Sequence, residues 1–543
     1  MIVESVRFCS LSSDHDVGRI QQYGLGEKKM KELQNVPTIR ELLDAAPVKF
    51  NDRTFIRFLR DGAMQERSFG KVRADSLAFC RRLRSLLPER THVAIISKSS
   101  YEYITCLTGI IIGGFVAVPI PPDAPAQEAA EIINDADVTV ILYGPEFAPK
   151  LETVRALCPA VREAVNLGDH ADFEKIYEEY NDASPYAALS DVKVDPAECS
   201  LLIYTSGTTG DKKGVMLSGK ALVSNMMFKP YNDIVNRADV ILSVLPLYHI
   251  FCFVTDYLGP LKNGNVLCLN GDIRDLFKNL LIFKPNQMRV VPMLAQALLG
   301  RIRALQAREP SLTPKEAAAR VTGGNLDMML SGGAYLDPAL CRAFDAMGIF
   351  LRQGYGMSES GCKITVPDQD TALDCVGRVM NICEARIRDG EIQVETPCRM
   401  IGYYKRPEET AAMFTEDGWL KTGDIGYLTE DRQLFVTGRV KNLIILSNGE
   451  NVSPEGIEKK YQASPLVSEV LVYAEDDMIV AAVYPDREYA DREGIADVSA
   501  ALQALTDRIN LNAPTSRTVA RLIVRDEPLE KTATGKILRK TNQ

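Results

Sequence analysis

Short β-rich apolar runs recur between about residues 37 and 435, and helix-like segments separate them. Examples are HVAIIS, VTVILYG, LLIYTS, ILSVLPL and MRVVPML. Strands that alternate with helices are typical of parallel sheets covered by helices, and such sheets bind ligands at the turns that follow their strands. The sequence pattern changes after about residue 440, where the runs EVLVYAED, MIVAAVYPD and RLIVRD surround one helical segment near 498–509. The sequence predicts an α/β fold: a large N-terminal domain of parallel-rich sheets packed with helices, plus a small C-terminal α+β domain.

The expected boundaries are residues 1–437 for the large domain, with an irregular extension at 1–36, and 442–543 for the small domain. A chain of 543 residues is long enough for two domains. The net charge of −9 argues against a nucleic-acid-binding protein, because that function needs clustered Lys and Arg. Twelve cysteines without a CxxC pair, and a start without an apolar signal core, predict reduced thiols in a cytoplasmic protein.

One apolar run, ITCLTGIIIGGFVAVPI at 104–120, is hydrophobic enough to be mistaken for a membrane-spanning helix. It has 17 residues, Gly113-Gly114 interrupts it and Pro119 lies near its end. A span needs about 20 apolar residues, so we expect a buried helix, a glycine turn and a short buried strand instead. Peripheral contact with a membrane stays compatible with the sequence.

The segment LLIYTSGTTGDKKGVMLS, at 201–218, is the most informative part of the chain. A β-rich run leads into glycines, hydroxyls and lysines, which together suit phosphate, and the pattern differs from a Walker loop. A flexible surface turn is the alternative, but it explains neither the adjoining buried strand nor the lysines. The candidate phosphate ligands are Thr205, Ser206, Gly207, Thr208, Thr209, Gly210 and Lys213.

Other segments combine a chemical possibility with an ordinary structural one. Tyr355 between two glycines suits stacking on a base, and Glu359 suits Mg²⁺, although Ser358 could equally cap a helix. Asp424 lies in a glycine-bounded turn, where a carboxylate can accept from ribose hydroxyls or simply stabilise the turn. Lys536 lies in a basic tail that solvent alone could explain, and His249 lies in an apolar stretch typical of a core.

A resemblance favours the chemical interpretation of these segments over the structural one. In order along the chain, they resemble the motifs of the adenylate-forming superfamily. That superfamily contains acyl-CoA synthetases, luciferases and peptide-synthetase adenylation domains. The segment at 201–218 is similar to its phosphate-binding signature, and the motifs that follow are LPLYHIFCF, SGGAYL, GYGMSES, GWLKTGDIGYL, GRVKNLIILSNGENVSPEGIE and KTATGKILRK.

The resemblance implies specific roles. Tyr355 stacks on adenine, Ser358 contacts phosphate and Glu359 holds Mg²⁺; this chain has Ser358 where many relatives have Thr. Asp424 and Arg439 bind ribose, Arg439 with phosphate as a second option, and Lys536 bridges the substrate carboxylate and the α-phosphate. The catalytic residues would be Thr205, Glu359 and Lys536. Further nucleotide ligands would be Gly332, Gly333, Ala334, Gly354, Gly356 and Met357.

The resemblance also implies that residues 438–441 form a hinge at Lys441, which makes the small domain mobile. His249, Phe251 and Gly333 would line the acyl pocket, whose edge Tyr335 reshapes where relatives often have proline. Amino-acid-activating relatives carry an aspartate just after the LPL-type motif, but here no acid precedes Asp256. An unpaired ammonium in that apolar setting would be costly, so an amino-acid substrate is disfavoured.

The implied reaction uses ATP and Mg²⁺ to convert a carboxylic acid to an acyl-adenylate and then a thioester. The wording at 438–458 most resembles long-chain fatty acyl-CoA synthetases, so we expect a medium- or long-chain fatty acid. No carrier-protein domain follows Gln543 in this sequence, so the expected thiol is CoA or the phosphopantetheine of a separate acyl carrier protein. The alternatives are an acyl- or aryl-acid ligase that loads a carrier protein, and a nucleotide-binding regulator without catalysis.

Overall fold

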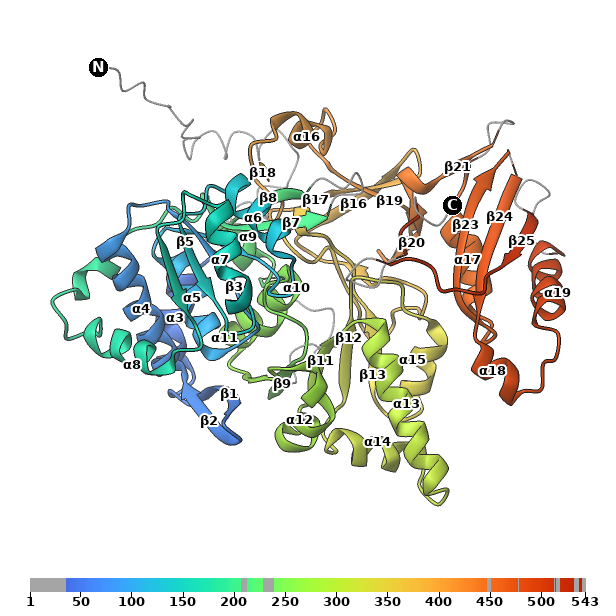
Figure 1. Cartoon of the computed structure of the whole chain (residues 1–543), viewed down its shortest axis with the longest axis horizontal. Helices are drawn as coiled ribbons and strands as arrows, with labels where there is room; N and C mark the ends of the chain where they lie inside the picture. Colours follow the sequence, from blue (N-terminus) through green and yellow to red (C-terminus); the bar gives the residue numbers. More distant parts are fainter. Residues whose placement is uncertain are drawn as a thin grey trace. The chain divides into compact units, whose positions relative to one another are not determined.

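The computed structural model describes residues 36–206, 212–227, 239–446, 451–476, 478–511, 513, 518–531 and 537–539 (Figure 1). The chain forms two compact units. The first takes its residues from Met1–Ala385, Val394–Leu420 and Asp431–Gln433, and the second from Arg386–Gln393, Lys421–Glu430 and Leu434–Gln543. The domain boundary that we expected at 437/438 stays a prediction.

The first unit contains a seven-stranded sheet in the order β18-β8-β7-β4-β3-β5-β6. Strands β3 to β6 are parallel to one another, and β7 and β8 form an antiparallel hairpin at one side. The strands are β3 (His92–Ile96), β4 (Val116–Pro119), β5 (Val140–Tyr143), β6 (Glu163–Asn166), β7 (Cys199–Ser206), β8 (Lys212–Ser218) and β18 (Gly402–Tyr403). The helices that accompany this sheet are α4 (Phe69–Leu86), α5 (Tyr101–Ile112), α6 (Ala126–Asp135), α7 (Ala148–Leu157), α8 (His170–Glu179) and α9 (Gly219–Ser224).

A second seven-stranded sheet has the order β13-β12-β11-β9-β10-β1-β2, and only the β1–β2 pair is antiparallel. Its strands are β1 (Thr54–Arg60), β2 (Ala63–Ser68), β9 (Val240–Ser243), β10 (Val266–Leu269), β11 (Gln287–Val290), β12 (Met328–Ser331) and β13 (Phe350–Gln353). One of its faces packs on α12 (Leu276–Phe283), α13 (Pro292–Arg308), α14 (Pro314–Thr322) and α15 (Pro338–Asp345).

A short helical passage between β9 and β10 shares one apolar core with strands of both large sheets. It runs as α10 (Ile250–Cys252), a π-helix η3 (Phe253–Leu258) and α11 (Gly259–Asn263). π-Helices are rare in proteins, and those that occur often lie at functional sites. The predicted acyl-pocket residue Phe251 lies in this passage.

The apolar run at 104–120 folds as we expected. Helix α5 is buried along its whole length, Gly114 adopts φ +77°, and β4 follows, also buried. Among the described residues, no helix is both long and apolar enough to cross a lipid bilayer. The described cysteines are all free, and only Cys199 among them is not fully buried.

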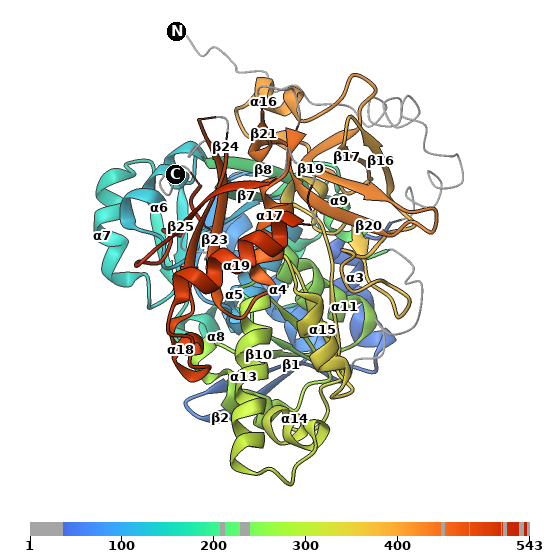
Figure 2. The ribbon, with the colours of Figure 1, turned by 90° about the vertical axis from the view of Figure 1, so that its right-hand side faces the viewer.

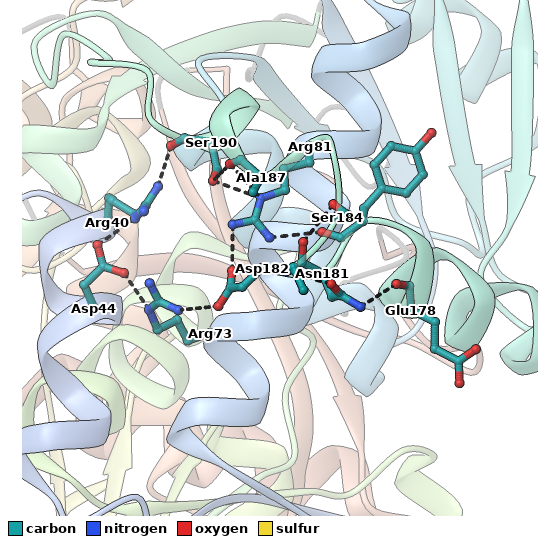
Figure 3. Close-up of polar contacts among 12 residues, drawn as sticks. Arg40, Asp44, Arg73, Arg81, Glu178, Asn181, Asp182, Ser184, Ala187 and Ser190 are labelled. Carbon is teal, nitrogen blue, oxygen red and sulfur yellow. Dashed lines mark hydrogen bonds and ion pairs between the residues drawn. The ribbon is translucent and has the colours of Figure 1, made fainter.

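Charged side chains attach helix α3 (Ile39–Lys49) and the loop before β7 to helix α4 (Figure 3). Asp44 accepts from Arg40 and Arg73, each at 2.7 Å, and Arg73 also lies 3.5 Å from Asp182. Arg81, whose side chain is only 5% exposed, donates to Asp182 Oδ1 at 2.7 Å, to Ser190 Oγ and to backbone oxygens. The buried guanidinium therefore has its donors satisfied, which gives this network a structural role.

The second unit holds most of a four-stranded sheet, β16-β17-β19-β20, and a three-stranded sheet, β23-β24-β25. Helices α17 (Pro454–Gln462) and α19 (Val498–Leu511) pack against the three-stranded sheet (Figure 2). The strands are β16 (Glu384–Arg388), β17 (Glu391–Glu395), β19 (Leu420–Leu428), β20 (Leu434–Arg439), β23 (Val467–Glu475), β24 (Met478–Pro485) and β25 (Val519–Val524). The smaller elements of the chain are β14 (Thr365–Val366), β15 (Arg378–Val379), α16 (Pro407–Ala412), β21 (Ile444–Ile445), β22 (Asn451–Val452) and α18 (Arg487–Arg492). The predicted fold class, α/β with a small C-terminal α+β domain, is confirmed.

Candidate functional site

The β7–β8 hairpin carries the candidate phosphate residues. Its register sets Thr205 opposite Lys213, and Lys212 forms an ion pair with Glu128 on α6. The Lys213 ammonium lies 5.2 Å from the centre of the Tyr403 ring. The tip residues Gly207, Thr208, Thr209 and Gly210, and the side chain of Ser206, lie outside the described residues.

Glu359 lies near this hairpin. Strand β18, which comes much later in the chain than the hairpin, connects the two. Its short helix, η5 (Ser358–Ser360), buries the carboxylate to 9% exposure, and Tyr403 Oη donates to Glu359 Oε1 at 2.8 Å. Strand β18 in turn pairs with β8, so that Tyr403 lies opposite Val215. Burial, and then Glu359, raise the pKa of Tyr403, which keeps the hydroxyl protonated as a donor. One tyrosine thus contacts both the predicted metal carboxylate and a lysine of the phosphate hairpin.

Sequence reasoning did not single out Tyr403. Its signal was present in CRMIGYYKRPEET, a glycine–tyrosine pair between two recognised motifs. Nothing in that local pattern indicates a partner at Glu359, because the two residues are 44 positions apart in the chain.

The loop that contains Tyr355 requires glycine in its backbone. A Cβ atom on Gly356 would lie 1.7 Å from the Cys362 carbonyl oxygen, a distance that no side chain can tolerate. Cys362 itself has φ +115°, a strained value for a residue with a side chain. The amide of Tyr355 donates to Thr365 Oγ1 at 3.0 Å, and the half-buried ring belongs to this tightly fixed loop.

The residues predicted for the acyl pocket lie where parallel strands end. Gly332 follows β12 and donates its amide to the Val290 carbonyl at 3.2 Å. The Phe251 ring lies against it, 3.5 Å from where a Cβ of Gly332 would be. Gly333 has φ +79°, and the Ala334 carbonyl accepts from Gln353 Nε2 at 3.1 Å. The carboxyl ends of β11, β12 and β13 meet here, the usual ligand position in such sheets.

His249 precedes α10, and part of its ring is exposed. Surrounding protein atoms still desolvate the ring enough to lower the pKa of His249, although Asp123 opposes this. The neutral imidazole is therefore the main form at neutral pH. Its ring centre lies 4.6 Å from that of Tyr248.

The second unit carries the predicted ribose ligands next to each other. Asp424 and Arg439 are opposite each other in the β19–β20 hairpin, and Arg439 Nε lies 2.8 Å from Asp424 Oδ1. A cavity of about 260 Å³ adjoins the pair, lined by Glu391, Thr422, Gly423, Arg439, Val440 and Lys441. Lys536, the predicted catalytic lysine, lies outside the described residues.

The donor set suits Mg²⁺ bound together with a nucleotide. Among the described residues, no group of three or more His, Cys, Asp and Glu side chains is arranged to hold a metal alone. Mg²⁺ in nucleotide enzymes is usually held by one or two carboxylates and the substrate phosphates. Glu359, buried and next to the phosphate hairpin, fits that pattern.

Comparisons with known proteins agree with this geometry. The AMP-binding enzyme family matches residues 43–404, and the AMP-binding enzyme C-terminal domain matches residues 441–543. The long-chain-fatty-acid–CoA ligase FadD15 of Mycobacterium bovis is 28% identical over 439 residues, covering 72% of each chain. The long-chain-fatty-acid–CoA ligase 5 of Rattus norvegicus is 27% identical over 487 residues, which is 77% of this chain and 70% of the relative.

Solved structures share the fold along most of their length. The anthranilate CoA ligase AuaEII in complex with anthranoyl-AMP has a TM-score of 0.76 at 20% identity, covering 94% of this chain and 98% of that one. ATP-bound MatB from Rhodopseudomonas palustris has a TM-score of 0.77 at 22% identity, covering 93% and 99%.

The family match spans most of the chain, in both its large and its small part. The β7–β8 hairpin, the tyrosine loop and the Asp424–Arg439 pair lie in the segments that carry the sequence motifs. The chain therefore belongs to the AMP-binding enzymes, the adenylate-forming superfamily, and is an AMP-forming acid–thiol ligase.

Proposed function

We propose that this protein activates a medium- or long-chain fatty acid with ATP and transfers the acyl group to CoA. The products are acyl-CoA, AMP and pyrophosphate, and the reaction takes place in the cytoplasm. The observation that carries the proposal is the contact of Tyr403 with both Glu359 and Lys213, beside the β7–β8 hairpin. The curated relatives named as long-chain-fatty-acid–CoA ligases support the choice of substrate.

In the first half-reaction the substrate carboxylate attacks the α-phosphate of ATP in line. The hairpin, from Thr205 to Gly210 with Lys213, binds the phosphates that leave as pyrophosphate. Mg²⁺ held by Glu359 would neutralise charge on those phosphates. Preorganised cations and amides stabilise the charge that builds during phosphoryl and adenylyl transfer, and this is the main catalytic contribution of such sites.

The remaining nucleotide contacts come from residues with matching chemistry. Tyr355 provides a ring for adenine, flanked by the backbone of Gly354, Gly356 and Met357, and Ser358 provides a hydroxyl for phosphate. Gly332, Gly333 and Ala334 border both the base and the acyl group. We assign the ribose hydroxyls to Asp424 with Arg439, and the bridge from carboxylate to α-phosphate to Lys536.

The second half-reaction is attack by the CoA thiol on the mixed anhydride, which breaks the acyl–phosphate bond and releases AMP. Rotation of the small domain about Lys441 would withdraw Lys536 and admit the thiol, a form of gating common in enzymes with mobile domains. The acyl group would lie against Phe251, His249 and Gly333.

A pyrophosphate-exchange assay over a panel of carboxylic acids tests the proposal. We expect ATP-dependent exchange with medium- or long-chain fatty acids and weak exchange with amino acids and aryl acids. A thioester assay that offers CoA and a holo acyl carrier protein then identifies the acceptor, for which we expect CoA. ATP binding without exchange on any acid would refute the proposal and favour a regulator.

A further inference from the structure

Three polar side chains lie buried on the π-helix η3 and strand β11, and the nucleotide chemistry uses none of them. Asp256 on η3 is 0% exposed, and Gln287 and Arg289 on β11 are 1% and 5% exposed. Arg289 Nη1 donates to Gln287 Oε1 at 2.8 Å. Arg289 Nε lies 3.6 Å from Asp256 Oδ1. We call these three residues the polar cluster.

The polar cluster leaves hydrogen-bonding atoms without partners in the described part of the chain. These atoms are Asp256 Oδ2, Arg289 Nε and Gln287 Nε2. A separation of 3.6 Å is too long for a hydrogen bond, and each unmet buried group costs about 1–3 kcal/mol. Three such atoms together indicate that a further polar group belongs among them.

The polar cluster adjoins the residues predicted to contact the acyl group. Thr255 Oγ1 donates to the Phe251 carbonyl at 2.7 Å and to Asp256 Oδ1 at 3.2 Å. On the strand side, the residue after Arg289 is Val290, whose carbonyl accepts from Gly332. The polar cluster is therefore joined to the backbone of Phe251 through Thr255, and on β11 it lies one residue from the backbone that binds Gly332.

The chemistry of the unmet atoms selects the group that would fit. They offer two N–H donors and one carboxylate acceptor, and a hydroxyl can accept from the donors while it donates to the carboxylate. A second carboxylate on the substrate could accept from both N–H donors but has no proton to donate to Asp256, and an ammonium could donate to Asp256 but cannot accept from Arg289 or Gln287. An unsubstituted alkyl chain would leave all three atoms unpaired.

The protonation of the polar cluster agrees with this choice. Burial raises the pKa of Asp256 to about 6, although Arg289 lowers it, so the carboxylate is mainly ionised and an acceptor at neutral pH. Burial also lowers the pKa of Arg289, but the guanidinium remains protonated.

We propose that the polar cluster is a specificity site for a hydroxyl group on the acyl chain, so that the preferred substrate is a hydroxylated carboxylic acid. This inference rests on the proposed function, since it assumes that an acid is activated at Phe251 and Gly332. The competing explanation is a structural ion pair bridged by an ordered water.

Pyrophosphate exchange with matched acids tests the proposal. Each pair has the same chain length, with and without a hydroxyl, and the hydroxyl is moved along the chain from pair to pair. Sites that hydrogen-bond a substrate hydroxyl discriminate strongly against the analogue that lacks it. We expect kcat/KM to be at least about 10-fold higher for one hydroxylated position than for the unsubstituted acid.

The double variant Asp256→Leu/Arg289→Met removes the charged pair and keeps similar volume. Replacing a buried pair by apolar residues is often neutral or stabilising, so the variant should fold. Its preference for the hydroxylated acid should fall to about parity or reverse. The control is Asp368→Leu/Arg378→Met, which removes an ion pair of a buried aspartate and a partly buried arginine, with 2.8 Å between Arg378 Nε and Asp368 Oδ2, and should keep the preference.

The single variant Gln287→Met removes only the Gln287 amide, with its unpaired Nε2 and its Oε1. It serves if the double variant does not fold, and the hydroxyl preference should again fall. Exchange with unsubstituted acids that equals exchange with hydroxylated ones, in the wild type, would overturn the inference and leave the proposed function standing. Absence of exchange on every acid would instead contradict the proposed function itself.

Discussion

The hydrogen bond from Tyr403 to Glu359 allows a sharp test of the site. In Tyr403→Phe the ring stays against β8 and Lys213, and the loss is confined to the hydroxyl that donates to Glu359 Oε1 at 2.8 Å. Glu359 is buried, so solvent cannot easily replace that donor. The carboxylate would then lose the contact that fixes its orientation toward Mg²⁺ and phosphate.

The size of the effect follows from the charge of the acceptor. A hydrogen bond to a charged group contributes about 1.5–3 kcal/mol. At about 1.4 kcal/mol for each factor of ten, this corresponds to roughly a 10- to 100-fold change. Changes in groups that orient a metal ligand typically weaken metal binding by about the same factor.

The assay is pyrophosphate exchange at saturating ATP and acid, titrated with Mg²⁺. We expect the Mg²⁺ concentration for half-maximal exchange to rise at least about 10-fold in Tyr403→Phe, with a smaller loss at saturating Mg²⁺. The control is Tyr404→Phe, because the neighbouring tyrosine donates to Asp137 Oδ2 at 2.8 Å and does not contact Glu359. Tyr404→Phe should leave the Mg²⁺ dependence unchanged.

Two results would refute this reasoning. If both variants lose activity by the same factor with an unchanged Mg²⁺ midpoint, Tyr403 acts only through packing. If Tyr403→Phe has the midpoint of the wild type and full activity, the orientation of Glu359 does not depend on the tyrosine hydroxyl.

Three further predictions address other parts of the chain. Lys536→Ala should abolish acyl-adenylate formation yet largely spare thioester formation from supplied acyl-AMP, and an equal loss of both half-reactions would contradict the assigned role. Gly356→Ala should lower the free energy of unfolding by about 3 kcal/mol and abolish exchange, because its Cβ would clash with the Cys362 carbonyl, whereas Gly300→Ala, with open space around it, should be harmless in a urea titration. Burial raises the pKa of Asp256 to about 6, so near pH 5 the folded state binds a proton that the unfolded chain has lost. The free energy of unfolding of the wild type, relative to Asp256→Asn, should therefore rise as the pH falls from about 7 to about 5. Urea titrations that give the same difference between the two proteins at both pH values would argue against it.

Local patterns in the sequence predicted those features of the fold that depend on neighbouring residues. The glycine pair at 113–114 separates a helix from a strand, as the sequence predicted, because such a break follows from backbone sterics within a few residues. Asp424 and Arg439 were predicted separately as ribose ligands, and the hairpin register places them in contact.

Contacts between distant segments were beyond such patterns. Tyr403 donates to Glu359, which lies 44 residues earlier in the chain, and its strand β18 pairs with β8, nearly 190 residues earlier. Asp256 and Arg289 are separated by one strand, two α-helices and a short 3-10 helix, and neither the apolar run around Asp256 nor the strand pattern around Arg289 indicates a charged partner. Sequence periodicity reports which face of an element is buried, but not what it meets there.

The pairing of β18 with β8 also has a consequence for biosynthesis. Strand β8 lies next to the end of its sheet, and the two-residue strand β18 pairs with its outer side. During synthesis on the ribosome, the outer backbone groups of β8 stay unpaired until β18 has been made. Exposed strand edges can pair with other chains. The phosphate hairpin should thus be among the last parts of its sheet to close. Fragments that end before Gly402 should tend to aggregate even though they contain every other strand of both large sheets.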